Sequence, residues 1–229
     1  MFVGDGAGLG VRNGEKNTMK GIICAGRLTT CILLAGLLAG CAFGTREATL
    51  VYPPSPEGEA KVAVAKAVSP VARETKIHLR QFADERSDKK VVGTVRNAYG
   101  MRTADVVSKN SVTAWITEAI ALELKNRGFT VVQGEAKSPP EVGSIVMGGD
   151  ILNVFCDMYL SYTGQVSLVV KVTDSSGEVF SRHYAGEGSA GIAFAATSES
   201  FAASLSQALA AALEKMMADI DAKFPPAGK

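Results

Sequence analysis

The sequence predicts an α+β fold: a single domain with a mixed sheet of about four to five strands, an antiparallel meander, and two helices packed on one face of the sheet. Three observations support this prediction. A helical apolar stripe lies between two strand-like segments, a run of alternating segments follows it, and an Ala-rich amphipathic segment closes the chain. We expect the domain to cover residues 71–224, with a short tail at 225–229.

The first predicted strand is 75–82, because Ile77 and Leu79 alternate there with polar residues such as His78. The polar stretch that follows it, residues 83–108, is long for a connection in a compact domain. A loop of this length is usually functional, mobile or host to a short element, and the sequence leaves these three alternatives open.

An amphipathic helix is expected between Ser111 and Arg127, where apolar residues recur at helical spacing. Asn110 or Ser111 can cap its first amides, and Gly128 can end it in the left-handed conformation. Trp115 lies on the apolar stripe and should pack in the core. The strand 129–133 follows with little spare chain, which favours a crossover that packs the helix on the sheet.

The second half predicts a meander of three strands at 144–158, 165–173 and 178–185. Gly148-Gly149 should mark a bulge or bend in the first of them, and the turn after it should lie around Thr163-Gly164. The residues expected on the inward face of the first strand are Leu152, Val154, Cys156 and Met158. A long helix from Ser198 to about Lys223, ended by Pro225-Pro226, closes the domain.

The N-terminal region has the features of an export signal. Lys20 and Arg27 precede an apolar run at 31–38, and small residues follow it. The run is too short to cross a hydrocarbon core of about 30 Å, so we expect residues 19–40 to be a signal peptide cleaved between Gly40 and Cys41. Residues 1–18 resemble no export signal and are expected to be a misassigned extension ahead of Met19.

The residues Leu38-Ala39-Gly40-Cys41 resemble the lipobox of bacterial lipoproteins. This resemblance implies diacylglycerol on the Cys41 thiol and an N-acyl chain on its new amine, enough for stable membrane anchoring. Ala42 in the next position implies sorting to the outer membrane, with the protein on its periplasmic face. Residues 41–70, which contain several prolines, are expected to form a tether, with 61–68 as an alternative edge strand.

Charge and cysteine content exclude two classes. Removal of residues 1–40 reduces 24 basic and 23 acidic residues to 20 and 21, a net charge of −1, which lacks the footprint of a nucleic-acid-binding protein. Cys24 and Cys31 leave with the signal and Cys41 is lipidated, so Cys156 is alone and no intramolecular disulfide can form. On an inward strand face this thiol should behave as an inert hydrophobe.

Two further patterns are weighed as sites. Residues 186–191 fit G-x-G-x-x-G, but the expected acidic residue and second parallel strand are missing, so a flexible connection is favoured over a cofactor loop. His78 and His183 have no metal-ligand spacing and should face solvent on their strands. We therefore expect no cofactor, no metal and no catalytic residues.

The charged cluster at 84–90 offers two interpretations. It could be a solvated loop that Arg86 fixes by a bidentate pair with a neighbouring carboxylate such as Asp84, or it could hold a partner through these two residues. The same alternatives, loop staple or partner contact, apply to Arg96 and Asn97.

The pattern FxDxR…GxxRN, together with the lipobox, the helix ending KNRGF, the meander and the last helix, resembles the YajG-type bacterial lipoproteins. The residues that carry it are Phe82, Asp84, Arg86, Gly93, Arg96 and Asn97. More distantly, the chain is similar to the auxiliary lipoproteins of ABC-type transport systems. The resemblance implies a compartment and a domain shape, not a reaction.

From these observations we expect a non-enzymatic envelope interaction module that binds a protein or polymer while its lipid holds it at the membrane. The alternative is a carrier of a lipid or other apolar ligand, with a pocket between sheet and helices lined by Met158, Tyr159 and Phe194. An enzyme acting on peptidoglycan comes third, because it would need paired carboxylates or a nucleophile with its base.

Overall fold

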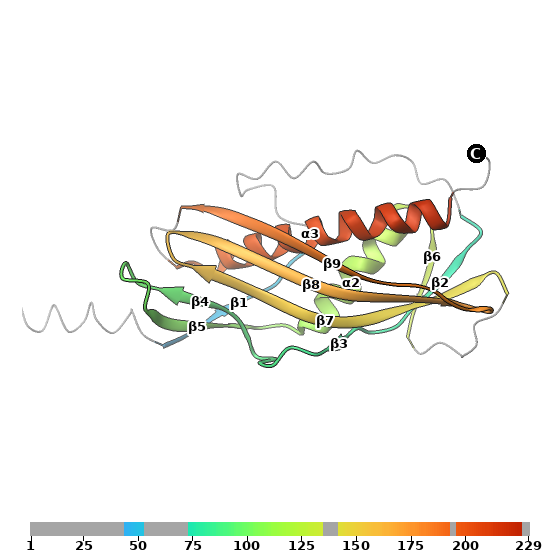
Figure 1. Ribbon diagram of the computed structural model, residues 1–229. Helices are drawn as coiled ribbons and strands as arrows, with labels where there is room; N and C mark the ends of the chain where they lie inside the picture. The colour runs from blue at the N-terminus through green and yellow to red at the C-terminus, as the bar shows by residue number, and fades with distance from the viewer. Residues whose placement is uncertain (1–43, 53–72, 135–141, 193–195, 226–229) are drawn as a thin grey trace, which may run out of the picture. The chain divides into compact units, whose positions relative to one another are not determined.

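The computed structural model describes residues 44–52, 73–134, 142–192 and 196–225, which form an α+β unit of nine strands and two helices (Figure 1). The strands are β1 Gly44–Ala48, β2 Lys76–Leu79, β3 Ala83–Asp84, β4 Val91–Arg96, β5 Arg102–Ser108, β6 Thr130–Gln133, β7 Ser144–Met158, β8 Ser161–Asp174 and β9 Gly177–Ile192. The helices are α2 Val112–Asn126 and α3 Ser198–Lys223. Neither is both long and apolar enough to span a bilayer.

Strand β7 organises the sheet. One of its edges pairs antiparallel with β8, which in turn pairs with β9, so the predicted meander is confirmed. Its other edge pairs in succession with β2, β3 and β4, all parallel to it. On its far edge, β2 pairs with β6. Strand β4 pairs with β5, and β5 pairs with β1. The α+β class and the mixed sheet are therefore as predicted, but the expected four to five strands were too few.

Three of the missed strands lie in the polar stretch 83–108, which proves to host short elements. Strand β4 is buried on both faces in its middle, where Thr94 is 2% exposed and donates from Oγ1 to the carbonyl of Ala104 at 3.2 Å. A strand covered on both sides needs no alternation of apolar and polar residues. The period-two pattern on which the prediction relied is therefore absent there.

The fourth missed strand, β1, lies in the segment that was predicted to be a tether. Over residues 44–52 that prediction is wrong, because this segment belongs to the domain. Strand β1 pairs parallel with β5, and Asn110 then binds both backbone groups of Leu50, at 2.9 and 3.0 Å. The Trp115 indole donates to the carbonyl of Val51 at 3.0 Å. These hydrogen bonds involve the backbone of residues 44–52, so the side chains of this segment show no pattern that would predict them. The rest of the expected tether and the alternative strand 61–68 lie outside the described residues.

The β7–β8 hairpin differs in detail from the prediction. Its turn lies at Tyr159-Leu160, and Thr163-Gly164 is already inside β8. The register runs continuously through Gly148-Gly149 and shifts between Ile151 and Asn153 instead. That bulge turns Leu152 outward, where it is 45% exposed, while Val154, Cys156 and Met158 face the core as expected.

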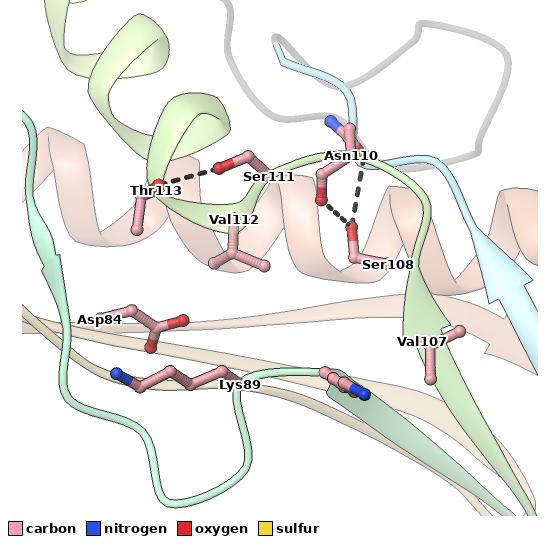
Figure 2. Close-up of a pocket in the computed structure, with 9 residues that line it drawn as sticks. Asp84, Lys89, Val107, Ser108, Asn110, Ser111, Val112 and Thr113 are labelled. Atoms are coloured by element: carbon pink, nitrogen blue, oxygen red, sulfur yellow. Dashed lines mark hydrogen bonds between the residues drawn. The ribbon is translucent and has the colours of Figure 1, made fainter.

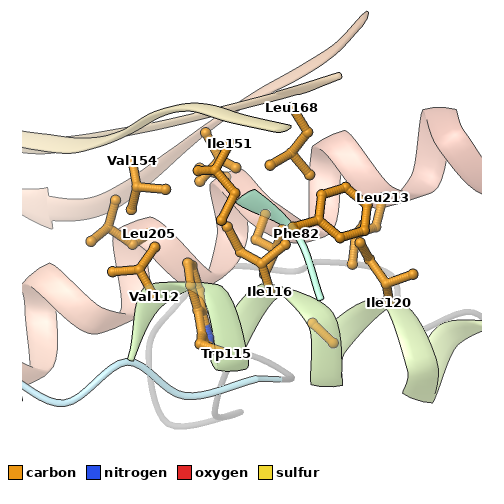
Figure 3. Packing of buried hydrophobic residues seen from close by; sticks show 14 of the residues in the cluster. Phe82, Val112, Trp115, Ile116, Ile120, Ile151, Val154, Leu168, Leu205 and Leu213 are labelled. Atoms are coloured by element: carbon orange, nitrogen blue, oxygen red, sulfur yellow. The ribbon is translucent and has the colours of Figure 1, made fainter. Parts of the chain in front are cut away.

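The helices follow the prediction closely. Ser111 caps α2 by accepting from the amide of Ala114 at 3.2 Å, and Gly128 beyond its end has φ +85°. Figure 3 shows α2 residues such as Trp115 and Ile116 in one cluster with α3 and with strand residues. Phe82, the first residue of the FxDxR pattern, is 1% exposed in this cluster.

The G-x-G-x-x-G pattern is neither a cofactor loop nor a flexible connection, because it lies inside β9. A Cβ at Gly186 would stand 2.1 Å from the carbonyl oxygen of Ala208, and one at Gly188 would stand 2.2 Å from that of Ser204. The glycines therefore let the backbone of α3 approach β9 directly. The spacing of Gly186 and Gly188 places both on the strand face that packs against α3.

Candidate functional site

The loop between β3 and β4 is fixed by Arg86, which is 7% exposed. Its guanidinium forms a bidentate pair with Asp84, with both N–H···O distances at 2.9 Å. The same guanidinium donates to the carbonyls of Lys89 and Val91, at 2.7 and 3.0 Å. This is the geometry of a loop staple, since one side chain closes the loop on itself.

The acidic groups of this loop are stabilised as carboxylates. Burial tends to raise the pKa of Asp84, but the hydrogen bonds and charge of Arg86, helped by Lys89, outweigh it and hold that pKa below its ordinary value. Asp88 accepts from the amides of Lys90 and Val91, at 2.9 and 3.1 Å, and these bonds lower its pKa. The loop is therefore held by hydrogen bonds to the Asp84 carboxylate near its start and to the Asp88 carboxylate near its end.

An open cleft of about 500 Å³ lies between this loop, the end of β5 and the start of α2 (Figure 2). It is lined by Asp84, Lys89, Lys90, Val107, Ser108, Asn110, Ser111, Val112 and Thr113. Neither Lys89 nor Lys90 forms a side-chain hydrogen bond or ion pair with any residue that the structure describes. The cleft thus combines hydroxyl and amide groups with two lysines that donate no side-chain hydrogen bond within the described ranges, and the charge of Lys89 is partly balanced by Asp84.

The hydroxyl groups of the cleft are held by neighbouring polar atoms. The Ser111 hydroxyl lies 2.8 Å from that of Thr113, which accepts from Gln81 at 2.9 Å. Ser108 donates to the carbonyl of Asn110 at 2.7 Å. None of the lining residues is a histidine or a cysteine. Such an arrangement suits recognition of a charged or hydroxylated group.

A second open cleft, of about 730 Å³, lies on the other side of α2 near the ends of β2 and β6. It is lined by Leu79, Arg80, Gln81, Ala114, Thr117, Glu118, Gln133 and Gly134. Its polar groups have mixed charge, and nothing in their arrangement indicates a ligand.

Arg96 and Asn97 lie far from this loop staple, at the β4–β5 turn. Arg96 forms a bidentate pair with Asp157 on β7, at 2.9 and 3.0 Å, and donates to the carbonyl of Gly100. The Asn97 side chain accepts from the amides of Tyr99 and Met101, both at 3.0 Å. Arg96 and Asn97 of the GxxRN pattern therefore shape one hairpin turn, whereas Gly93 lies inside β4, where a Cβ would stand 2.6 Å from the carbonyl oxygen of Cys156.

That turn and the β7–β8 turn lie at the same end of the sheet (left in Figure 1). The phenol of Tyr159 joins them by donating to the carbonyl of Ala98 at 3.2 Å. Exposed apolar residues gather at this end, which we call the hairpin tip and define as Tyr99, Met101, Tyr159, Leu160 and Ile192. Sequence reasoning missed it because residues 83–108 were not resolved into strands; the turn chemistry of Asn97 was the available signal.

The remaining candidates lie apart from both features. Cys156 is fully buried, and burial raises the pKa of its thiol to about 12. His183 is exposed, with Nε2 2.6 Å from the Ser167 hydroxyl, and His78 lies in β2 between two buried residues that face the core. Within the described ranges, no three residues of the metal-binding types lie close enough to hold an ion. Cys41 and Gly40 lie outside the described residues.

Of the three residues that the alternative hypothesis places around an apolar pocket, the two that the structure describes lie in different surroundings. Met158 is 7% exposed and belongs to the core cluster, whereas Tyr159 is 41% exposed on the hairpin tip. Phe194 lies outside the described residues. Between the sheet and the helices, the described inward side chains pack against each other (Figure 3).

The described residues define a class, that of small α+β domains with a mixed sheet and two helices. The chain belongs to the Lipoprotein_16 family, described as uncharacterized lipoprotein, whose model matches residues 63–222. The resemblance to YajG-type lipoproteins is thereby confirmed. Membership implies membrane anchoring in the cell envelope. No curated protein matches the chain.

Several solved structures are similar in part. Protein XCC0632 from Xanthomonas campestris, of family DUF330, is 13% identical with a TM-score of 0.46, covering 78% of this chain and 98% of that one. A PelC dodecamer from Paraburkholderia phytofirmans is 15% identical, with a TM-score of 0.37 and coverages of 63% and 92%. Lipoprotein GNA1162 from Neisseria meningitidis is 13% identical, with a TM-score of 0.35 and coverages of 63% and 99%. With TM-scores this low, these structures support no functional conclusion.

Proposed function

We propose that this chain is an outer-membrane lipoprotein that faces the periplasm and acts, without catalysing a reaction, as an interaction module. Its acyl groups on Cys41 hold it at the membrane, and the cleft beside α2 holds an acidic group of an envelope partner protein. The observation that carries the proposal is the pair of lysines, Lys89 and Lys90, on a loop that Arg86 and Asp88 keep rigid. The Asp84 carboxylate attracts Lys89 but forms no hydrogen bond with it, so both ammonium groups keep their donors for a partner.

Rigidity matters because binding is opposed by the entropy lost when a loop becomes ordered. A charged loop is usually solvated and mobile, but this one is closed by hydrogen bonds to its own carbonyls and amides before any partner arrives. Its two lysines therefore meet a partner already positioned. A carboxylate of that partner would gain charge-assisted hydrogen bonds, each worth about 1.5–3 kcal/mol.

The non-enzymatic part of the proposal is supported by the chemistry of the cleft. Acid–base or nucleophilic catalysis needs a group of suitable pKa beside a nucleophile. Here the pKa of Asp84 is held low by Arg86, which keeps that carboxylate from accepting a proton near neutral pH. The Ser111 hydroxyl accepts from the helix amide of Ala114 and has no base beside it among the lining residues.

The test places a photo-crosslinking amino acid at Thr113, on the rim of the cleft, in the full-length protein in intact cells. We expect an adduct with a discrete envelope protein. Combining Lys89→Gln with Lys90→Gln should reduce that adduct at least about tenfold, because two charge-assisted bonds are lost. Lys125→Gln, which removes an exposed lysine from the far end of α2, is the matched control and should leave it unchanged.

Two results would contradict the proposal. One is the absence of any adduct from Thr113 while the protein is present and acylated. The other is an adduct that both lysine substitutions leave at full yield. Mass spectrometry of the same protein tests the anchor, since Cys41 must carry its acyl groups.

A further inference from the structure

We propose that the hairpin tip rests in the surface of the bilayer that holds the protein's own lipid anchor. The inference rests on the proposed acylation of Cys41. It assigns a lipid-facing surface to one end of the sheet and fixes how the domain stands on the membrane. The partner is the interfacial zone of that bilayer, where headgroups meet acyl chains.

The first observation is the exposure of the tip. Tyr99 is 87% exposed, Ile192 75% and Leu160 65%, and Met101 and Tyr159 are also exposed. The Tyr159 phenol binds across to the β4–β5 turn, and Ile192 pairs with Ser161 beside Leu160. The tip residues therefore form one group at the ends of neighbouring strands. Exposed apolar groups of this kind usually mark an interaction surface.

The second observation is where the described chain begins. Strand β1 starts at Gly44, whose register partner on β5 is Ala104, and β1 runs parallel to β5, away from the tip. Ala104 lies opposite Val95, and Val95 lies opposite Met158. These three residues stand at the level of the sheet next to the two turns that form the tip. Gly44, the first described residue, therefore lies toward the tip end of the sheet.

The third observation is the length of chain to the anchor. Cys41 precedes Gly44 by three residues, which span at most about 11 Å even when fully extended. Gly44 lies at the level of Val95, and Tyr99 follows Val95 by only four residues, through the β4–β5 turn. An acylated Cys41 thus cannot lie more than about 11 Å from the level of Gly44, so the anchor holds the tip next to the headgroups. The long tether expected from the sequence would have allowed any orientation.

The composition of the tip suits that location. Tyrosine is enriched at membrane interfaces because its ring is apolar and its hydroxyl is polar, and Tyr99 and Tyr159 both lie here. Arg96 and Arg102 flank the apolar residues with side chains 41% and 58% exposed, and each forms an exposed ion pair, with Asp157 and Asp105 respectively. Such cations can remain at the level of phosphate groups while neighbouring apolar side chains enter.

The experiment uses the full acylated protein in vesicles of phosphatidylethanolamine and phosphatidylglycerol with brominated acyl chains, which quench tryptophan. The chain has one tryptophan, Trp115, which is 4% exposed, so the unsubstituted protein supplies the background. Tyr99→Trp places a reporter on the tip. Val142→Trp is the matched control, because Val142 is 92% exposed just before the start of β7, at its other end.

We expect about half of the emission from the tryptophan introduced at position 99 to be quenched, since interfacial groups enter about 5–10 Å into the headgroup and acyl boundary. The control at position 142 should not be quenched. Leu160→Glu combined with Tyr99→Trp should reduce the quenching, because a carboxylate opposes entry of the tip.

Failures of the two proposals are distinguishable by mass spectrometry of the same samples. If Cys41 carries acyl groups and neither position is quenched, or both are quenched equally, the tip inference is overturned and the anchor stands. If Cys41 carries none, both proposals fall. If the tip is shielded instead by a second copy of the chain, sedimentation would show a dimer that Leu160→Glu dissociates, which also overturns the inference.

Discussion

Replacement of Asp84 by asparagine separates the two roles that the FxDxR pattern allows. Asparagine keeps the size of the side chain but removes its charge and one acceptor, so one of the two 2.9 Å bonds from Arg86 is lost. The guanidinium is left in a site where its side chain is only 5% exposed. It still donates to the carbonyls of Lys89 and Val91.

The magnitude follows from that burial. Removing one partner of a buried ion pair costs about 3–5 kcal/mol, and the retained acceptor and carbonyl bonds favour the lower end, about 3 kcal/mol. For a domain of this size, 1 kcal/mol corresponds to roughly 2–4 °C in the melting temperature, so Asp84→Asn should lower it by roughly 6–12 °C.

Urea and thermal unfolding, followed by the fluorescence of the single tryptophan, measure this change. Asp105→Asn is the matched control, because its pair with Arg102 is exposed, at 38% and 58%, and should contribute less than about 1 kcal/mol. If Asp84→Asn costs no more than Asp105→Asn, the staple interpretation is refuted. A role for Asp84 in contacting a partner would then gain weight.

The same substitution predicts a pH dependence. In the folded protein the pKa of Asp84 lies below its ordinary value of 3.8, so its stabilising contribution is fully present above that value. The contribution disappears as the pH falls through the folded pKa. The difference in unfolding free energy between the native chain and Asp84→Asn should therefore be constant from neutral pH to about pH 5 and shrink below about pH 4. A difference that persists unchanged in strong acid would contradict this.

Three further predictions concern the frame around the site. Gly188→Ala should destabilise the protein by about 3 kcal/mol in urea unfolding, since its Cβ would lie 2.2 Å from a carbonyl oxygen of α3, whereas Gly148→Ala, with its nearest atom at 3.4 Å, should change little. Cys156 should resist iodoacetamide at pH 8 until urea unfolds the chain, because burial raises its pKa to about 12; labelling of the folded protein would disprove this. Asn110→Ala should speed hydrogen exchange at the Leu50 amide at least about tenfold, and unchanged exchange would show that other contacts hold that segment.

The two helices and the meander were predictable because their information is local. The apolar spacing of α2, its cap at Ser111 and the alternation in β8 each arise from residues within one element. Period and capping reflect the geometry of the backbone at that point, so tertiary contacts need not be known. The export signal and the lipobox resemblance are local in the same sense.

The candidate site could be predicted only in part. The charged cluster indicated a staple or a contact, but the cleft joins that loop to the end of β5 and the start of α2. No spacing in the sequence reveals that these three segments meet. The hairpin tip was hidden for the same reason, since Ala98 and Tyr159 come into contact only when β4 pairs with β7.

Strands β1, β3, β4 and β5 show the physical limit most clearly. Strands β1, β3 and β4 are paired with strands distant in the chain, and β4 is also buried on both faces; neither condition requires a pattern in the strand's own side chains. Local residues therefore specified the helices and the meander. Long-range backbone pairing placed Gly44–Tyr52 on the domain and brought the cleft and the hairpin tip together, because such bonds connect groups that every residue except proline carries alike.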